Sequence, residues 1–347
     1  MHEDQPPSNA GSTGDRSRES HGFSVVAPAS AAGQRLDSVV AGMFPDYSRS
    51  RLQQWITSGF LTVNGDKRRS KDKLIGGEQL KLALPEDQLD DLASNGPIDD
   101  AANIRAEAVP LEIVHSDPHF YVINKPAGLV MHPAPGNRNG TLMNGLLHFD
   151  PALRCIPRAG IVHRLDKGTS GVCVVARTLK AHLSFVQQLQ SRKMGRQYLA
   201  VVAGQPQDEG EVEEPIARHP VDRKRMAVRP AGKHALTYYT VDSRFEGGAV
   251  LSVDLATGRT HQIRVHMTHI GHPLLGDHVY KKKGPLIKIN AWLHSEMPQW
   301  NRQALHARHL QLSHPASGEL CSFEQSPPDD MQQLIDNLPP LNTGEYE

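Results

Sequence analysis

Most of this chain is divided into short apolar segments rich in Val, Tyr and Thr, with few helical patterns between them. Beyond residue 109, six such segments follow one another: Leu111–His115, Phe120–Asn124, Val172–Ala176, Tyr198–Val202, Ala235–Val241 and Val250–Leu255. Segments of this composition predict β-strands. The clearest helical pattern, with apolar residues at 179, 183, 186 and 189, runs from Leu179 to Lys193. Successive strands with few helices favour an α+β domain with a central, mostly antiparallel mixed sheet over alternating βαβ units.

A smaller α/β unit is predicted ahead of this domain, at residues 21–84. Apolar residues at 36, 39, 40 and 43 predict one helix, and Leu52, Trp55 and Ile56 mark the buried face of a second. Leu61–Gly65 predicts a strand that enters an Asn-Gly turn, and Leu80–Leu84 predicts the returning strand. The remaining divisions are a disordered tail at 1–20, an acidic linker at 85–108, the larger domain at 109–335 and a second tail at 336–347.

The charges are balanced in number but not in distribution. The chain has 38 Lys and Arg residues and 38 Asp and Glu residues, a balance that by itself argues against a nucleic-acid partner. Three runs are nevertheless basic: Arg49–Lys73, Arg177–Arg196 and Arg218–Lys233. Because a polyanion responds to charges within about 8 to 10 Å in physiological salt, the zero net charge does not exclude RNA.

Several classes of protein are excluded by simpler features. The most apolar stretches, such as Gly171–Ala176 and Tyr198–Ala203, are too short to span a membrane. The first residues lack the basic start and apolar stretch of a secretion signal. The three cysteines are too scattered for a disulfide framework or a Cys-x-x-Cys metal site. We therefore expect a cytoplasmic protein that does not bind a membrane.

One segment has the density of Gly, Asp, Lys and hydroxyl residues that is typical of a catalytic loop. It is Gly160-Ile161-Val162-His163-Arg164-Leu165-Asp166-Lys167-Gly168-Thr169-Ser170-Gly171. It is not a P-loop, because Lys167 precedes Gly168 instead of following it. It is not a Gly-x-Ser-x-Gly nucleophile elbow, because Val172 stands where the last glycine is required. The local pattern predicts a tight loop that either fixes the Asp166 carboxylate for chemistry or uses it to cap a turn.

Together with later segments, this loop resembles the RluA family of RNA pseudouridine synthases. The main matches are His163–Gly171, Gly195–Ala200 and Thr257-Gly258-Arg259-Thr260-His261-Gln262-Ile263-Arg264-Val265-His266, the last at an entry to either a strand or a helix. Supporting matches are Asn124–Gly128, Ile216–Pro220, His272–Asp277 and Ala304–Ala307. The unit at 21–84, with Tyr47–Arg51 and Leu61–Gly65, resembles an S4 RNA-binding domain. The resemblance covers residues 22–335 and is greatest to members that modify large-subunit ribosomal RNA.

The resemblance implies that uridine is isomerised to pseudouridine. The C1′–N1 bond breaks, the uracil turns over, and C5 bonds to C1′. Because no atom is added or removed overall, the reaction needs no cofactor, no metal and no hydrolytic water. One carboxylate suffices, whereas glycoside hydrolases usually need two. By position it is Asp166, which either attacks C1′ or takes the proton from C2′, and the sequence does not choose between the two.

Three more residues match the family's site. Arg264 would pair with Asp166 and hold the carboxylate in one orientation. The ring of Tyr198 would stack on uracil, and its hydroxyl would serve the proton transfer from C5. Arg164, two residues before the aspartate and on the same face of an extended segment, would fill the space that the flipped nucleotide leaves.

The expected partner is RNA, either 23S ribosomal RNA or a precursor of the large ribosomal subunit, bound by a monomeric enzyme. The basic face of the S4-like unit would contact phosphates through Arg49, Arg51, Lys67, Arg68 and Arg69. The run Arg218–Lys233 is either a further backbone contact or a solvated loop.

Other interpretations have less support. A noncatalytic ribosome-assembly factor with this fold would be favoured by loss of Asp166, Tyr198 or Arg264, and all three are present. A nucleoside hydrolase would need a second well-placed carboxylate, and none stands out. Histidines at 261, 266, 269 and 272 lack the spacing of a helical metal site, so we predict no metal. For His163 we expect a structural hydrogen bond.

Overall fold

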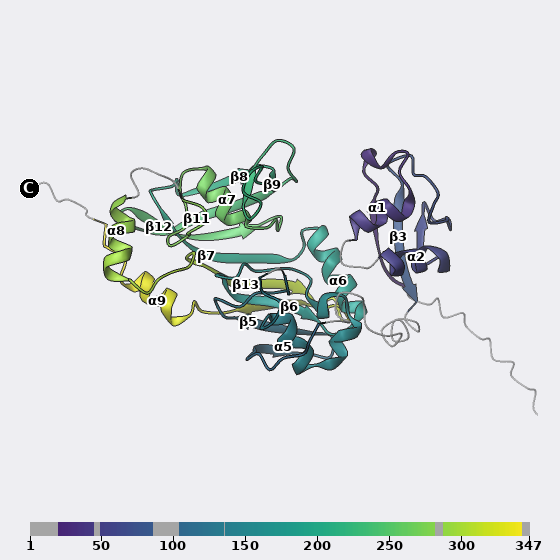
Figure 1. Cartoon of the computed structure of the whole chain (residues 1–347), viewed down its shortest axis with the longest axis horizontal. Coiled ribbons are helices and arrows are strands. Elements are labelled where there is room, and N and C mark those ends of the chain that lie inside the picture. Colours follow the sequence, from purple (N-terminus) through teal and green to yellow (C-terminus); the bar gives the residue numbers. More distant parts are fainter. Residues whose placement is uncertain (1–19, 45–48, 86–103, 135, 282–286, 342–347) are drawn as a thin grey trace, which may run out of the picture.

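The computed structural model describes residues 20–44, 49–85, 104–134, 136–281 and 287–341. Figure 1 shows a small N-terminal unit beside a larger α+β unit built on one broad sheet. Residues 1–19 of the predicted N-terminal tail, 342–347 of the predicted C-terminal tail and most of the predicted linker lie outside the described residues, and the predicted boundaries between units remain predictions. In the part of the chain that is described, no helix combines the length and the apolar character needed to cross a bilayer.

The N-terminal unit contains both predicted helices and both predicted strands. These are α1 (Leu36–Met43), α2 (Arg49–Ser58), β2 (Leu61–Val63) and β3 (Gln79–Pro85). Leu52, Trp55 and Ile56 are buried, as their spacing predicts. Asn64 and Gly65, with φ of 52° and 87°, form the expected turn, which joins β2 to Asp66 before the chain returns along β3.

The strand β1 (Ser20–Val26) was not predicted. It pairs antiparallel with β3 along its whole length, so the sheet of this unit has the order β1-β3-β2. Ser20, which the prediction placed in the tail, is its first residue. The segment has little alternation of its own and becomes a strand because β3 offers it an unpaired edge.

The larger unit is organised by a mixed sheet with the order β4-β5-β6-β13-β7-β12-β11-β8, and β14 pairs with β13. Its strands are β4 (Glu112–Ser116), β5 (Phe120–Lys125), β6 (Ser170–Ala176), β7 (Gly195–Ala203), β8 (Glu209–Glu213), β11 (Leu236–Phe245), β12 (Gly248–Leu255), β13 (Leu305–Ser313) and β14 (Leu320–Glu324). The hairpin β9 (Ile216–Arg218) and β10 (Met226–Val228) stands apart from it. Among these strands the one parallel pairing joins β6 to β13, which confirms the predicted, mostly antiparallel sheet.

Helices flank this sheet at intervals. They are α5 (Leu142–Phe149), α6 (Leu179–Gln190), α7 (Gln262–His269), α8 (Ile287–Glu296) and α9 (Asp329–Asp336), with short 3₁₀ turns at Ala29–Ala31, Pro151–Cys155 and Pro157–Gly160. The helix predicted from Leu179 is confirmed as α6, and the edge of its Phe185 ring packs against Phe120 of β5. Of the other four, α7 begins in a segment that the sequence left open between a strand and a helix, and α5, α8 and α9 were not predicted. Each has ten residues or fewer, which is too short for a clear helical period.

The register of the sheet brings distant segments together. Gly171 of β6 lies opposite Ala307 of β13, and Ala307 lies opposite Tyr198 of β7. Gly171 has φ +110°, and a Cβ there would lie 2.1 Å from the Ala307 carbonyl oxygen, so this close approach requires glycine. Because neighbouring strands lie about 4.8 Å apart, the loop that precedes β6 opens roughly 10 Å from Tyr198.

Candidate active site

Asp166 lies in the loop that leads into β6. The amide N–H of Thr169 donates to the main-chain oxygen of Asp166 at 3.0 Å and closes the tight turn that the sequence predicts. The side-chain carboxylate of Asp166 points away from this turn, and 12% of the side chain is exposed. Beneath the loop, the fully buried Lys125 donates to the carbonyl oxygens of Pro126 and Leu129 at 2.8 and 2.9 Å, and more weakly to that of Lys167. Burial lowers the pKa of Lys125 to about 8.

Arg264 on α7 holds the Asp166 carboxylate. Its Nη1 donates to Asp166 Oδ2 at 3.0 Å, although the two residues are 98 apart in the sequence. Its Nε and Nη2 donate to both oxygens of Asp277, at 2.7 and 3.0 Å. Burial lowers the pKa of the guanidinium, but the hydrogen bond to Asp277 and the charges of both carboxylates outweigh it, so the pKa of Arg264 is raised. One planar cation therefore orients Asp166 while a second, buried carboxylate orients the cation.

The segment before α7 completes this side of the site. The sequence left open whether Thr257–His266 enters a strand or a helix, and the structure has the helix. Nε2 of His261 lies 3.8 Å from Asp166 Oδ1, and its Nδ1 lies 2.7 Å from the hydroxyl of Tyr280. That hydroxyl accepts the N–H of Met226 at 2.8 Å. Its own hydrogen is thus available to Nδ1, an arrangement that turns the Nε2–H of a neutral His261 toward Asp166.

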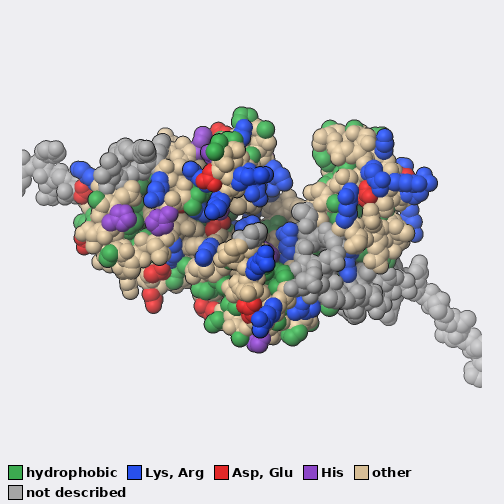
Figure 2. All heavy atoms as spheres, in the orientation of Figure 1, with side chains coloured by type: hydrophobic (Ala, Val, Ile, Leu, Met, Phe, Trp, Pro, Cys, Tyr) green, Lys and Arg blue, Asp and Glu red, His purple; other side chains and the backbone are tan. Residues whose placement is uncertain are grey.

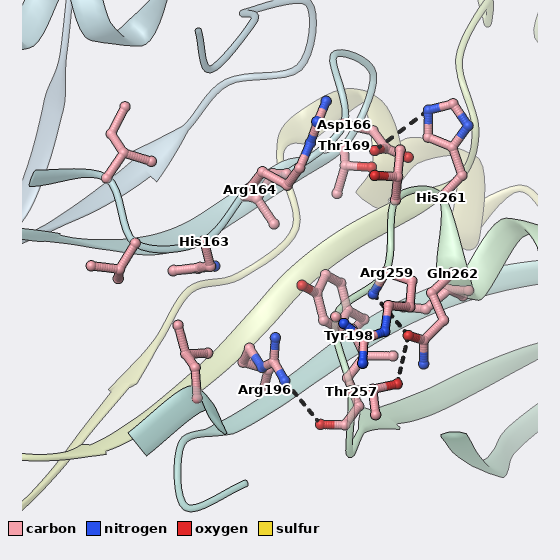
Figure 3. Close-up of a pocket in the computed structure, with 18 of the residues that line it drawn as sticks. His163, Arg164, Asp166, Thr169, Arg196, Tyr198, Thr257, Arg259, His261 and Gln262 are labelled. Atoms are coloured by element: carbon pink, nitrogen blue, oxygen red, sulfur yellow. Dashed lines mark hydrogen bonds and ion pairs between the residues drawn. The ribbon is translucent and has the colours of Figure 1, made fainter. Parts of the chain in front are cut away.

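Tyr198 lies on β7 across from the aspartate loop. The residue is 6% exposed, and its side chain lines the same cavity as Asp166. Burial, with smaller effects of nearby charges, raises the pKa of Tyr198 to about 12. Figure 3 shows Tyr198 below Asp166 and His261, beside Arg259 and Arg196.

Asp166, Tyr198, His261 and Arg264 line one cavity of about 840 Å³. Of the described residues around it, six are arginines and one, Asp166, is a carboxylate. The arginines are Arg158, Arg164, Arg192, Arg196, Arg259 and Arg264. A cavity of this volume admits a nucleotide, and its charge suits an anion. Arg164 is exposed and, as expected, on the Asp166 side of the loop (Figure 3).

The basic residues predicted for the N-terminal unit are brought only partly together. Lys67, Arg68 and Arg69 line a second cavity of about 730 Å³, against the last turns of α2. Arg49 and Arg51 lie on the first turn of α2 and do not line it. Figure 2 shows Lys and Arg side chains gathered on this unit and around the central hollow of the larger one.

The tripeptide Arg-Leu-Asp occurs twice, at residues 35–37 and 164–166, and the two aspartates have different partners. In the copy at residues 35–37, Arg35 donates to both oxygens of Asp37 at 3.0 and 2.9 Å, at the start of α1. The hydrogen bond from Arg35 is the main cause of the lowered pKa of Asp37, about 2. This ion pair is local, and its Arg35 lines the 730 Å³ cavity of the N-terminal unit and not the cavity that holds Asp166.

The histidines have structural partners. His163 Nε2 accepts the N–H of Val174 at 3.1 Å, the structural role expected of it, and burial lowers its pKa to about 3. His266 bonds to the Thr237 hydroxyl and the Glu214 carbonyl, and His272 to the Ala203 carbonyl.

Two residues of the site, Asp277 and Tyr280, were not predicted from the sequence. Asp277 lay within a quoted matching segment without a role, and Tyr280 follows it by three residues. Their only signal in the sequence is a Gly-Asp pair beside an apolar run, which is typical of any turn. Their function becomes visible through the contacts of Arg264 and His261.

Comparisons with known proteins agree with this geometry. A family model described as RNA pseudouridylate synthase matches residues 119–269, and an S4 domain model matches residues 34–80. The "Ribosomal large subunit pseudouridine synthase D" of Xanthomonas campestris is 45% identical over 318 residues, which cover 90% of this chain and 92% of the relative. The protein of that name from Escherichia coli K12 is 46% identical over 307 residues, covering 88% and 90%.

A solved human structure supports the same fold. "Human RNA Pseudouridylate Synthase Domain Containing 4" is 26% identical, with a TM-score of 0.52, and the match covers 65% of this chain and 92% of that one. The predicted α+β fold, the S4 domain and the predicted family are thereby confirmed, and an RNA substrate follows from the family. On identity and coverage together, this chain belongs to the RNA pseudouridylate synthase family.

Proposed function

We propose that this protein isomerises specific uridines of large-subunit (23S) ribosomal RNA to pseudouridine; its relatives are named as pseudouridine synthases of the ribosomal large subunit. The observation that carries the proposal is the Asp166–Arg264 pair, 3.0 Å apart, at the wall of a cavity that Tyr198 also lines. A carboxylate oriented by an arginine and open to a nucleotide-sized cavity is what the isomerisation requires.

In the proposed mechanism Asp166 acts on the sugar of a nucleotide that has left its stack. Arg264 holds the carboxylate in one orientation, aimed either at C1′ as a nucleophile or at the proton on C2′ as a base. Uracil leaves as an anion, and the arginines around the cavity favour that charge. Uracil then turns over within the cavity and C5 bonds to C1′. This step breaks the Asp166–C1′ bond on the nucleophilic route, or is followed by return of the proton to C2′ on the base route. The proton on C5 leaves and N1 takes up a proton, so no atom is added or removed overall.

Two side chains serve the base. The ring of Tyr198 offers a stacking surface, and its hydroxyl stays protonated because burial raises its pKa to about 12. Arg164 is exposed at the rim, where it can enter the gap left by the flipped nucleotide. Flipping a nucleotide out of its stack costs a few kcal/mol, and this cost is lowest in loops. We therefore expect the target uridines to lie in single-stranded loops.

The N-terminal unit would dock the RNA. Lys67, Arg68 and Arg69 border an open cavity, and Arg49 and Arg51 extend the basic surface along α2. Phosphate contacts of this kind give affinity and position, while the catalytic cavity selects the base. We expect a monomeric enzyme in the cytoplasm.

The test is direct. The purified chain is incubated with unmodified 23S rRNA transcripts of Escherichia coli and Xanthomonas campestris and with precursor large subunits. Pseudouridine is then mapped by carbodiimide-blocked primer extension. We expect stops at a few loop uridines with wild type and none with Asp166→Asn, which changes one oxygen to nitrogen and keeps the volume.

The alternative, a noncatalytic assembly factor, makes the opposite prediction. RNA binding without pseudouridine on any transcript or precursor would support it and overturn the proposal. Equal product from wild type and Asp166→Asn would remove Asp166 from the mechanism. A thermal melt of the variant shows that any loss of product does not come from unfolding.

A further inference from the structure

The cavity holds more positive charge than the proposed chemistry uses. Arg264 has two carboxylate partners. In contrast, Arg192, Arg196 and Arg259 line the same cavity and form no ion pair with a carboxylate among the described residues. The pairing of Asp166 and the filling of the gap in the stack do not explain them, and a single uracil anion would offset only one of the three charges.

Arg196 is the most unusual of the three. The residue is only 8% exposed, and its buried Nε has no hydrogen-bond partner in the described part of the chain. Its Nη2 donates to the Leu255 carbonyl at 3.4 Å, near the limit for such a bond. Burial, followed by the charge of Arg259, lowers the pKa of Arg196. A buried guanidinium with one weak contact lacks the partners that a buried charge requires.

The neighbours of Arg196 increase this charge instead of neutralising it. Arg259 Nε donates to the His234 carbonyl at 2.9 Å, which fixes the side chain without a counter-ion. Burial, and then the charge of Arg192, lowers the pKa of Arg259. Arg196 therefore lies within electrostatic range of Arg259, and Arg259 within range of Arg192, on the lining of one cavity, and a bound anion would relieve their repulsion.

The backbone is adapted to this arrangement. A Cβ on Gly258 would lie 2.6 Å from Arg196 Nη1, so the absence of a side chain there lets the guanidinium reach the cavity. Arg196 and Tyr198 are two residues apart on β7, and both are buried on the same face. That spacing is roughly 7 Å. Figure 3 shows Arg196 and Arg259 on the same side of Asp166 as Tyr198.

We propose that Arg196, with Arg259 and Arg192, forms a phosphate subsite that binds a phosphodiester next to the nucleotide whose base stacks on Tyr198. The inference rests on the proposed function for the identity of the anion as an RNA phosphodiester. Guanidinium groups suit this role because they bind phosphate oxygens with two parallel N–H donors. Binding the phosphate beside the reacting sugar would hold C1′ against Asp166.

The first experiment uses a small probe that needs no activity. Uridine 3′,5′-bisphosphate and uridine are titrated calorimetrically into wild type, Arg196→Met and Gly258→Ala. We expect Arg196→Met to weaken the bisphosphate about 10- to 100-fold, the value of one charge-assisted contact, and to leave the affinity for uridine unchanged. Gly258→Ala should weaken the bisphosphate as well, because it displaces the guanidinium without removing a charge.

A matched control separates the subsite from general charge. Arg244 lies on β11 outside the cavity, where it pairs with Asp208. Arg244→Met removes the same charge, and we expect it to leave bisphosphate binding unchanged. We also expect Arg196→Met to melt no lower than wild type, because it replaces a buried charge that has no carboxylate partner. If Arg196 were purely structural, Arg196→Met would instead lower the melting temperature and leave the affinity for the bisphosphate unchanged.

The second experiment uses RNA. A fragment around a uridine that the wild type modifies is made with one neutral methylphosphonate at each linkage in turn. One linkage beside the target should reduce wild-type binding strongly and Arg196→Met binding little, and the salt slope of the variant should fall by about 1. Losses that are equal in both proteins at every linkage, or a bisphosphate affinity unchanged by Arg196→Met, would overturn the subsite. Failure of the proposed function would differ, because wild type would form no pseudouridine whatever the result of the bisphosphate titration.

Discussion

At the scale of single residues, Tyr198 shows how burial selects a role. Its ring lines the cavity, while burial raises the pKa of its hydroxyl to about 12. Below that pH the phenol is neutral and keeps its proton, so the hydroxyl can pass a proton between substrate and solvent but does not add a negative charge near Asp166. The ring and the hydroxyl can therefore be tested separately.

We expect Tyr198→Phe to keep RNA binding and to slow product formation by roughly 10²- to 10⁴-fold, the usual range for a lost proton-transfer group. The ring, which supplies stacking, is retained. The measurement is single-turnover kinetics on substrate with hydrogen or deuterium at C5 of uracil. A deuterium effect should become visible in the variant, because removal of the C5 proton becomes slow. Identical rates for wild type and variant would show that only the ring matters.

Arg264 shows why residue type matters at this position. Its guanidinium reaches Asp166 with one nitrogen and Asp277 with the other two, all within 3.0 Å. Lysine could not form this planar set of three bonds. In the same tripeptide around Asp37, the ion pair of the aspartate is made by an arginine two residues away, and Gln53 of α2 adds one hydrogen bond at 3.0 Å.

At the scale of elements, the C-terminal helix α9 supports the catalytic loop from outside. Arg302 donates to the Gly168 carbonyl at 3.2 Å, two residues after Asp166, and its Nε and Nη2 bind both oxygens of Asp330 on α9 at 2.8 Å. Its guanidinium also lies 4.5 Å from the centre of the Trp300 ring. Through Asp330, α9 therefore holds Arg302 in place, and Arg302 in turn holds the loop at Gly168.

This arrangement predicts that Asp330→Ala lowers kcat about threefold to tenfold with little change in KM, because the loop loses a restraint and the RNA surfaces stay intact. Asp330 is half exposed, so the change in stability should be within about 1 kcal/mol. Asp329→Ala is the matched control, since it removes the neighbouring carboxylate of the same first turn. Indistinguishable kcat values for the two variants would exclude the coupling.

At the scale of the whole molecule, one buried and two partly buried histidines make the fold sensitive to acid. Burial lowers the pKa of His132 to about 4 and those of His163 and His182 to about 3, against 6.5 for an exposed histidine. The folded chain keeps these groups neutral while the unfolded chain protonates them. Their contribution to stability is therefore complete above about pH 6.5 and is lost as the pH falls from there toward 3.

We expect the free energy of unfolding in urea to fall between pH 7 and pH 5, by an amount on the order of 1 kcal/mol per pH unit for each of these three histidines. His163→Gln should make this dependence shallower, because an amide can still accept the N–H of Val174 and does not titrate in this range. Parallel curves for wild type and variant would contradict this origin of the acid sensitivity.

The sequence by itself indicated the α+β class, the mostly antiparallel sheet and the helix α6, and its resemblance to a family indicated the S4-like unit and the candidate residues Asp166, Tyr198, Arg164 and Arg264. These features are written in contiguous stretches, where side-chain periods and short motifs act over a few residues. The pairing of Gly171, Ala307 and Tyr198, the double grip on Arg264, the isolation of Arg196 and the support from α9 were decided by the tertiary structure. Each joins residues far apart in the chain, and the free energy of such contacts depends on strand register and burial, which exist only after the sheet has formed.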